Sequence, residues 1–397
     1  MRATTYCYPW DIARLGVQTT LSQIQDDGFD AIDLAATYHP IDSLSPREGF
    51  RLFSDARGAV YFPARQERYG RIKPKVHSAE LAAAWLQSAE HAAKIGLGLN
   101  AWTITLFQPW IRDVHEDCAR VLPSGDASGS GVCAANPDVR DYVTTLCADI
   151  SDQFGIDLVR LEGIMPHTFD LDWLRPRSLV TISPTVRTLS SLCFCSACTA
   201  RAAAGGLDLE RIRRTVNETI AAEIAGQPGG EDRALALAAD AELTAFAENH
   251  VRASIGLVRD VADRIGGSGR VAVNAITPYR SLLGDEREDV LLRGFIDAAS
   301  QTGLNVLDLA GNKRVAALNA GMDHPREMSA LYVTIRNPTV TSAAMLAQTG
   351  ADKIVQNLQA AVDLGVTEFS LYSYGILPDA DVQAFIAAVR QLQPVQA

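Results

Sequence analysis

Short apolar segments alternate with amphipathic ones along this chain, which is the pattern of a β/α protein. Eight segments carry alternating or continuous apolar residues and are followed by a Gly, Pro, Asn or Asp break. They predict strands at residues 2–8, 30–36, 97–105, 157–162, 270–276, 304–309, 330–335 and 367–373. Helical periodicity appears at residues 19–27, 79–94, 137–153, 207–226, 230–265, 286–302, 312–320 and 341–364. Eight strands alternating with helices favour an α/β fold, a closed (β/α)8 TIM barrel.

The interval between the fourth and fifth predicted strands is much longer than an ordinary loop. Residues 163–269 contain two helical segments and a cluster of cysteines. We therefore expect one barrel domain over residues 1–397, with residues 163–269 as a long helical and cysteine-containing excursion after strand 4. The first strand is not followed by a Gly-x-Gly-x-x-Gly motif, so the sequence predicts no dinucleotide and no organic cofactor.

Composition and charge narrow the classes of partner. Hydrophobic residues make up 47% of the chain, enough for a large core, and the formal net charge is -11. Such an acidic chain is a poor partner for nucleic acid or an anionic membrane, because both need a basic face. No apolar run approaches the about 20 residues of a membrane span, and the N-terminus shows no signal segment, so we expect a cytoplasmic protein. The sequence does not decide between a monomer and a homo-oligomer.

Polar and aromatic residues gather where the predicted strands end, which in a parallel barrel is one rim. The fourth strand ends at Glu162, and Asp308 lies at the end of the sixth. Aromatic rings pack against the C–H faces of sugars, while amides and carboxylates bind sugar hydroxyls, so this rim suits a carbohydrate substrate. The candidate substrate-binding residues are Tyr8, Tyr38, His39, Asn100, Trp102, His167, Asn274, Arg336, Tyr372 and Tyr374.

Two carboxyl groups on this rim predict hydrolysis of a glycosidic bond. The reaction needs one acid that protonates the leaving oxygen and a second carboxylate that attacks the sugar or activates water. We expect Glu162 to be the general acid/base and Asp308 the nucleophile or base. Both carboxyl groups could instead have a structural role, because a strand-end carboxylate can also cap a helix or pair with a buried arginine. The aromatic residues could likewise be packing residues, since large aromatics commonly lie in cores. Asp33 stays unassigned, and the histidines in helices or loops, His250 among them, are expected at the surface.

A group of closely spaced cysteines predicts a metal site. The segment 193–198 has Cys-x-Cys-x-x-Cys spacing, and thiolates this close along the chain can share one tetrahedral zinc. The favoured ligands are Cys133, Cys193, Cys195 and Cys198. Cys118 and His167 are alternatives for the fourth position. An all-sulfur shell leaves no open position for water, so the zinc would be structural; the alternative is a set of reduced, buried thiols.

Residues 133–198 resemble the corresponding region of the family-42 β-galactosidases. In that family a Cys-x-Asn-x-Pro-like segment opens a helix, a strand-four glutamate is the acid/base, and a Cys-x-Cys-x-x-Cys group follows; several members bind structural zinc there. The resemblance implies Glu162 as acid/base and the four cysteines as zinc ligands. Over most of its length the chain looks closer to bacterial TIM-barrel proteins that resemble glycosidases. This likeness rests on ATYHP (36–40), VYFP (60–63), NAWT (100–103), CAANPDVR (133–140), LCFCSAC (192–198) and YSYGILP (372–378).

One segment departs from the β-galactosidase pattern. That family carries its nucleophilic glutamate at the end of strand seven, whereas here residues 333–338 read VTIRNP, without a carboxylate. Asp308 on strand six is therefore the first choice for the second carboxyl group. A pairing of strands four and six resembles the α-galactosidase group of barrels instead.

Two other functions remain open. A metal-dependent sugar isomerase or epimerase is one, because GFDAIDL at 28–34 resembles the second strand of that barrel superfamily. Strands five to eight, however, end without the His and Glu ligands that such enzymes use to hold a divalent ion. The other is a non-catalytic carbohydrate-binding barrel, which would keep the aromatic and amide lining and lack a correctly spaced carboxyl pair.

Overall fold

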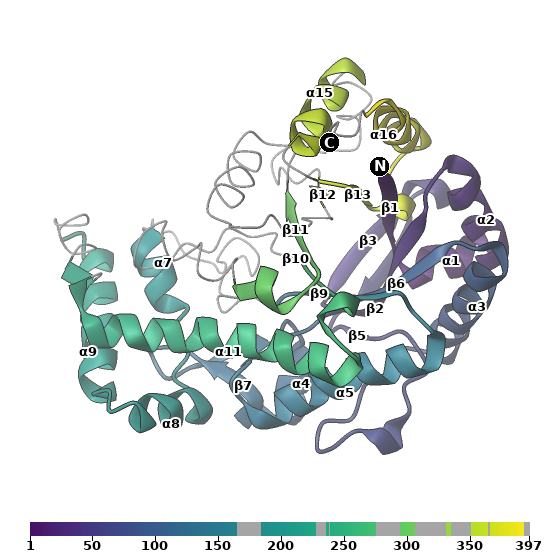
Figure 1. Cartoon of the computed structure of the whole chain (residues 1–397). Helices are drawn as coiled ribbons and strands as arrows, with labels where there is room; N and C mark the ends of the chain where they lie inside the picture. Colours follow the sequence, from purple (N-terminus) through teal and green to yellow (C-terminus); the bar gives the residue numbers. More distant parts are fainter. Residues whose placement is uncertain are drawn as a thin grey trace.

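A parallel sheet forms the centre of this computed structural model (Figure 1). The structure describes residues 1–164, 184–227, 236–237, 239–274, 294–305, 331–334, 351–363 and 366–392. The parallel strands are β1 (Arg2–Cys7), β2 (Ala31–Tyr38), β6 (Gly98–Ile104), β9 (Leu158–Glu162), β10 (Val271–Asn274), β11 (Gln301–Asn305), β12 (Leu331–Thr334) and β13 (Glu368–Tyr372). Each pairs in parallel with the next, and β13 also pairs with β1, so the pairings return to their start. The predicted α/β class with a parallel sheet is confirmed.

Helices cover the outer side of this sheet. All residues of β2 are buried, as expected for a strand with other strands' side chains on one face and helices on the other. The main helices are α1 (Pro9–Leu15), α2 (Val17–Asp27), α3 (Ala79–Ile95), α5 (Pro137–Phe154), α11 (Ala241–Ile265), α15 (Ala351–Val362) and α16 (Asp379–Gln391). Asn136 caps α5, because its Oδ1 accepts hydrogen bonds from the backbone N–H groups of Asp138 and Val139. None of the described helices has the length and apolar character needed to cross a lipid bilayer.

Short elements lie in the connections between strands and helices. β3 (Ile41–Ser45) and β4 (Arg51–Asp55) form an antiparallel hairpin, and β5 (Ala59–Val60) pairs antiparallel with the end of β2. The others are β7 (Ala119–Val121) paired with β8 (Ala127–Val132), α4 (Pro109–Val114), and the 3-10 turns η1 (Pro46–Glu48), η2 (Gln66–Arg68), η3 (Glu116–Cys118), η4 (Ser268–Arg270) and η5 (Tyr374–Ile376). These elements were not predicted from the sequence, because most are too short to show a period.

The sixth strand begins earlier than its hydrophobic pattern predicts. β11 starts at Gln301 and pairs with Ala272 of β10, whereas the apolar pattern begins only at Leu304. The predicted helix over 286–302 therefore ends too late. The first half of β11 reads Gln-Thr-Gly, so no apolar alternation marks it, and pairing with β10 decides its place. The predicted helix at 312–320 lies outside the described residues.

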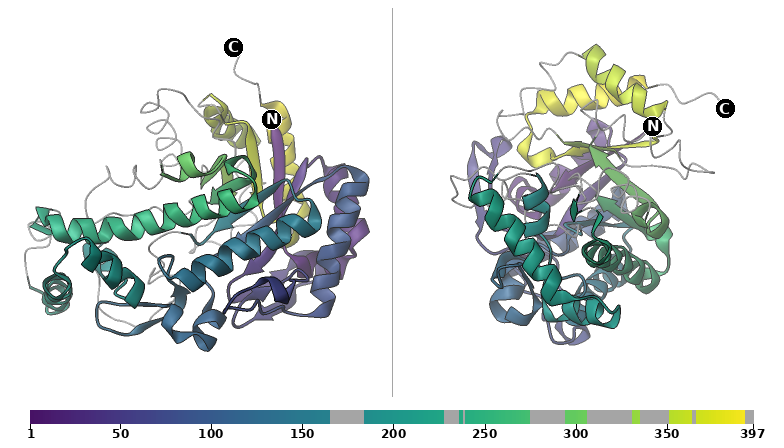
Figure 2. Two further views of the ribbon diagram at one scale, coloured as in Figure 1. Left: turned by 60° about the horizontal axis from the view of Figure 1, so that its bottom comes forward. Right: turned by 90° about the vertical axis from the view of Figure 1, so that its left-hand side faces the viewer.

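The long segment after β9 builds a second, smaller hydrophobic core. Its helices are α7 (Pro184–Ser190), α8 (Ser196–Ala204), α9 (Leu209–Ile224) and the first part of α11. Leu243 and Phe246 of α11 belong to this second core, while Val251 to Ile265 of the same helix pack into the main core. Figure 2 shows α8 and α9 gathered near the end of α11 that lies away from the sheet. One continuous helix of 25 residues, about 37 Å long, thus joins both cores.

Candidate active site at the ends of the central strands

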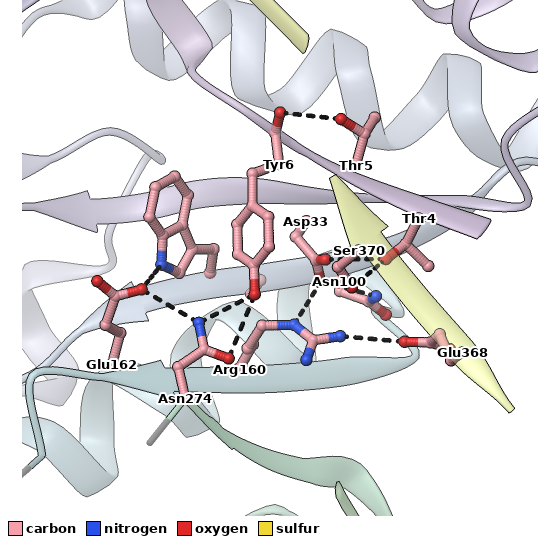
Figure 3. A network of polar contacts seen from close by, with 12 residues as sticks. Thr4, Thr5, Tyr6, Asp33, Asn100, Arg160, Glu162, Asn274, Glu368 and Ser370 are labelled. Atoms are coloured by element: carbon pink, nitrogen blue, oxygen red, sulfur yellow. Dashed lines mark hydrogen bonds and ion pairs between the residues drawn. The ribbon is translucent and has the colours of Figure 1, made fainter. Parts of the chain in front are cut away.

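Glu162, the last residue of β9, lies at the carboxyl ends of the strands with two hydrogen-bond donors on one of its oxygens. Trp102 on β6 donates from Nε1 to Glu162 Oε2 at 2.9 Å, and Asn274, the last residue of β10, donates from Nδ2 at 3.1 Å. The glutamate is buried, with 6% of its surface exposed. Both donors are neutral N–H groups, so Oε2 is held as an acceptor. Figure 3 shows Asn274 directed at this carboxyl group.

The register of the sheet explains why these residues meet. In the pairing of β6 with β9, Trp102 lies opposite Arg160 and Ile104 lies opposite Glu162. Residues two apart on a strand share a face, so Arg160 and Glu162 point to the same inner side of the sheet. Because all these strands are parallel, their carboxyl ends form one edge, where Asn274 joins the group.

Three tyrosine hydroxyls form a hydrogen-bonded trio beside Glu162. Tyr8 follows β1, Tyr38 ends β2 and Tyr372 ends β13; the Tyr8 and Tyr38 oxygens are 2.9 Å apart, and the Tyr38 and Tyr372 oxygens 3.0 Å apart. Tyr8 also hydrogen-bonds Tyr372. All three rings contact Trp102, with centroid separations of 4.9–5.7 Å. Burial raises the pKa of Tyr8 well above its ordinary value, so this hydroxyl stays neutral.

A stack of aromatic rings connects the trio to the β3–β4 hairpin. Phe53 of β4 stacks on Trp10 with ring centroids 4.0 Å apart, and Trp10 stacks on Tyr8 at 4.3 Å. On the other side, His39 packs against Tyr38 at 4.2 Å, with its Nδ1 2.7 Å from the carbonyl oxygen of Pro40. The rim therefore has a continuous aromatic wall with one neighbouring imidazole.

A buried ion cluster lies beneath the rim. Arg160 is fully buried; its Nε donates to Asp33 Oδ1 at 2.8 Å and its Nη2 donates to Glu368 Oε1 at 3.2 Å. Asn100 Nδ2 donates to the same Asp33 oxygen at 2.9 Å. Burial raises the pKa of Glu368, and Arg160 partly offsets this rise. Asp33 thus has a structural partner, which explains a charged residue between apolar ones.

Tyr6 also belongs to this region, although it was not among the predicted site residues. Its hydroxyl lies 3.2 Å from Asn274 Oδ1 and 3.0 Å from Asn274 Nδ2, and its ring meets Trp102 edge to face at 4.8 Å. A signal was present, because Tyr6 is two residues before Tyr8 and so shares the inner face of β1. Arg160 carried a similar signal as a lone charge two residues before Glu162.

Other predicted residues are placed differently. Asn100 belongs to the ion cluster below the rim, as described above. Tyr374 points away from the rim, since its hydroxyl donates to Asp27 Oδ2 at 2.7 Å and Arg47 lies over its ring at 4.0 Å. The chain turns into η5 after β13, so the strand alternation that would return Tyr374 to the inner face is lost. Three predicted residues lie outside the described part of the chain: Asp308, His167 and Arg336.

The four cysteines of the predicted metal site lie together. The sulfur atoms of Cys133, Cys193, Cys195 and Cys198 are all within 4.8 Å of one another and all four residues are buried. The backbone N–H of Ala135 donates to Cys133 Sγ at 3.4 Å. Hydrogen bonds from the surrounding thiols, that of Cys133 first, hold the pKa of Cys193 well below its ordinary value. The same contacts lower the pKa of Cys195 and raise those of Cys133 and Cys198, so only some of the four sulfurs are held as thiolate, the form that binds metal.

His250 is buried beside these cysteines, so the expectation of a surface histidine is wrong. Its Nδ1 lies 2.9 Å from the carbonyl oxygen of Phe246, which can only accept, so Nδ1 carries the hydrogen. Nε2 lies 3.0 Å from both the backbone nitrogen and the carbonyl oxygen of Cys193, and with the hydrogen on Nδ1 it accepts from that N–H group. Burial lowers the pKa of His250, consistent with this neutral form. α11 therefore holds the cysteine segment through one imidazole.

The described residues offer a second group of potential metal ligands, and it is already neutralised. Asp117, Cys118 and Asp138 lie close together, but Arg71 donates to both carboxylates at 2.6–2.8 Å. Neither this group nor the cysteine group includes a residue of the central parallel strands. Within the described residues, the rim therefore holds no set of three ligands of the kind an isomerase would need.

Comparison with solved structures finds glycoside hydrolases among the proteins that share this fold. An α-L-fucosidase isoenzyme from Paenibacillus thiaminolyticus matches with a TM-score of 0.56 and 12% identity, over 98% of this chain and 49% of that one. The PgaB (BpsB) glycoside hydrolase domain from Bordetella bronchiseptica matches with 0.51 and 13% over 100% of both chains. A β-galactosidase from the psychrophilic Marinomonas ef1 matches with 0.52 and 9%, over 98% and 59%.

These similarities concern the fold alone, because the identities are low. The chain spans about half of the fucosidase chain and 59% of the β-galactosidase chain. Protein-family models and curated protein sequences gave no match.

Proposed function

We propose that this chain is a glycoside hydrolase-like enzyme that acts on a small glycoside or an oligosaccharide, with Glu162 as its general acid/base. The observation that carries the proposal is the environment of Glu162: a buried carboxyl at the end of β9, with two N–H donors on Oε2 and an aromatic wall beside it. The fold of the fucosidase, the PgaB domain and the β-galactosidase supports it. So does the resemblance of residues 133–198 to the family-42 β-galactosidases.

In this proposal the two oxygens of Glu162 have different roles. Oε2 accepts hydrogen bonds from Trp102 and Asn274, so the acid form carries its proton on Oε1. Glu162 delivers that proton to the leaving glycosidic oxygen and later accepts one from water. The rings of Trp102 and the tyrosine trio offer faces for the sugar. Asp308 is the proposed nucleophile or base, and we propose residues 163–269 as the excursion of a complete (β/α)8 barrel.

The test is the pair Glu162→Gln and Glu80→Gln, with chromogenic α-L-fucosides, β-D-galactosides and N-acetyl-β-D-glucosaminides as probes. Glu162→Gln should lower kcat about 10²- to 10⁴-fold on any glycoside that the wild type hydrolyses, because amides cannot donate the acid proton. Sugar binding, measured by calorimetry, should persist. Glu80 is an exposed residue at the start of α3, so its variant controls for the substitution itself. Unchanged turnover in Glu162→Gln would remove this residue from the mechanism.

We further propose that Cys133, Cys193, Cys195 and Cys198 hold a structural zinc ion. The residues fit this ion, because they supply four buried sulfurs close enough to share it, and an N–H group supports one of them. Zinc there would tie the loop between β8 and α5 to the segment between α7 and α8. An all-cysteine shell has no open position, so the ion would take no part in glycoside hydrolysis.

A further inference from the structure

Tyr6 contacts both hydrogen-bond donors of Glu162, although it lies below the rim and is fully buried. Its hydroxyl sits between the two heteroatoms of the Asn274 amide, at 3.2 Å from Oδ1 and 3.0 Å from Nδ2. Its ring meets the indole of Trp102 edge to face, with an interplanar angle of 76°. Figure 3 shows Tyr6, Asn274 and Glu162 following one another across the inside of the sheet.

Asn274 needs such support, because the terminal torsion of an asparagine amide is broad and soft. Asn274 Nδ2 must stay within hydrogen-bond distance of Glu162 Oε2 to stabilise the carboxylate. The hydroxyl of Tyr6 donates to Oδ1 and accepts from Nδ2, so it restrains the amide from the opposite side. Asn274 is itself almost fully buried, and an amide there is costly to leave without partners.

We propose that Tyr6 is a positioning residue for Glu162: it holds Asn274 so that Nδ2 remains on Oε2, and thereby sets the proton affinity of Glu162. The assignment of a proton-transfer role to Glu162 rests on the proposed function, whereas the effect of Tyr6 on its proton affinity does not. The contacts described above connect Tyr6 to Glu162 through Asn274 and Trp102.

The other charged and titratable groups around this chain of contacts belong to several strands. Arg160 of β9 and Asp33 of β2 lie on the lower side of Tyr6, and Arg160 offers a guanidinium 5.8 Å from the ring centre. Of the tyrosine trio, Tyr372 packs directly against the Tyr6 ring, with centroids 5.7 Å apart, while Tyr8, Tyr38 and His39 lie beyond Trp102. Burial raises the pKa of Tyr6 well above its ordinary value, so its hydroxyl keeps the proton that it donates. A Tyr6→Phe substitution leaves all these groups in place.

The experiment is an NMR titration of Glu162 in protein labelled with ¹³C at glutamate side-chain carboxyls, assigned by comparison with Glu162→Gln. Tyr6→Phe should raise the pKa of Glu162 by about 1 unit, because the ionised form loses a fixed donor. Tyr142→Phe is the matched control, since Tyr142 is also a buried tyrosine and lies on α5, outside the sheet. Its hydroxyl has no hydrogen-bond partner among the described residues, so the control should leave the pKa unchanged.

A double-mutant cycle separates this role from a general packing role. Asn274→Ala should raise the pKa of Glu162 at least as much as Tyr6→Phe, and the double variant should show no further rise. An unchanged pKa in Tyr6→Phe, or shifts that simply add in the double variant, would overturn the proposal. If Tyr6→Phe does not fold, Asn274→Ala still tests the contact on which the proposal depends, because an unchanged pKa of Glu162 in that variant overturns it.

Kinetics give a second readout if the wild type hydrolyses a glycoside. Tyr6→Phe should lower kcat more for an alkyl glycoside than for a dinitrophenyl glycoside, which needs little proton donation, and should leave KM unchanged. An equal loss on both substrates would contradict a role through Glu162. If the wild type hydrolyses no glycoside, the proposed function fails, and the titration still decides the role of Tyr6.

Discussion

Several charged residues are buried inside the sheet, below Glu162. A parallel barrel usually fills its interior with branched apolar side chains, whereas here Arg160, Asp33 and Glu368 form an ion cluster below Glu162. Each of these charged groups has a partner of opposite charge, which offsets the cost of removing it from water. Because Arg160 and Glu162 are two residues apart on β9, the cluster also fixes the strand that presents the proposed acid/base.

The buried carboxyl group of Asp11 predicts how the stability of the protein depends on pH. Burial raises the pKa of Asp11 to about 7, and nearby Glu48 adds to the rise, while Arg14 and Arg47 act against it. In the unfolded chain the pKa is about 3.9, so the folded state binds this proton more tightly. Ionisation of Asp11 in the folded protein therefore lowers the free energy of unfolding. This loss is absent below about pH 4, grows as the pH rises, and is complete above pH 7.

Asp11→Asn should remove this cost. The free energy of unfolding should exceed that of the wild type by ~1–4 kcal/mol at pH 8, and the difference should vanish near pH 4. Urea unfolding at pH 4, 6 and 8 measures it. Asp126→Asn, on an exposed turn, should change little at any pH. A constant difference across the three pH values would show that Asp11 does not titrate in this range.

At the scale of elements, several connecting segments contact parts of the chain that are distant from them in sequence. The β3–β4 hairpin reaches the tyrosine trio through Phe53 and Trp10, and the loop before α5 meets the segment after α7 at the four cysteines. His250 of α11 supports the same segment by accepting from the N–H of Cys193. Each junction joins pieces that are distant in sequence, so its loss should affect order beyond the altered residue.

Removal of one proposed zinc ligand tests the cysteine junction. Cys195→Ser should reduce bound zinc from one ion per chain to a small fraction and lower the Tm, because three sulfurs hold zinc much more weakly than four. Metal analysis by mass spectrometry and thermal unfolding measure the two effects. Cys147→Ser provides the control, since Cys147 is a buried cysteine of α5 outside the group and should keep the zinc. Wild-type protein without zinc would contradict the proposal.

At the scale of the molecule, α11 couples two hydrophobic cores. Its first turns pack in the core of α7, α8 and α9, and the rest packs beside α5 in the main core. A helix shared in this way should make the two regions unfold together, because its breakage in one core exposes apolar surface in the other.

Phe246→Ala tests this coupling. Phe246 is fully buried in the second core, so its truncation should cost ~3–5 kcal/mol. Four of the five tryptophans, Trp10, Trp85, Trp102 and Trp110, lie in the main core, so tryptophan fluorescence reports chiefly on that region. Fluorescence and far-UV circular dichroism should shift together in urea. A shift in circular dichroism alone would mean that the second core unfolds independently. Phe50→Ala is the control, since Phe50 is 71% exposed.

The sequence by itself predicted the strands of the central sheet, most of their ends and several of the helices. Glu162 ends a short, mostly apolar segment that predicts a strand, and Asn136 and Pro137 mark the start of α5. The cysteine spacing predicts a compact cluster. These features depend on residues adjacent in the chain, where propensity, capping and alternation act. The same local rules failed at Gln301, because only its partner strand β10 places it in the sheet.

Only the tertiary structure decided which side chains meet inside the sheet. Tyr6 meets Asn274 across 268 positions of sequence, and Arg160 meets Glu368 across 208. Tyr372 joins the trio while Tyr374, two residues on, turns to Asp27, because the strand has ended between them. Such contacts arise when strands pair in register and their inner faces are brought together, and no local pattern encodes that geometry.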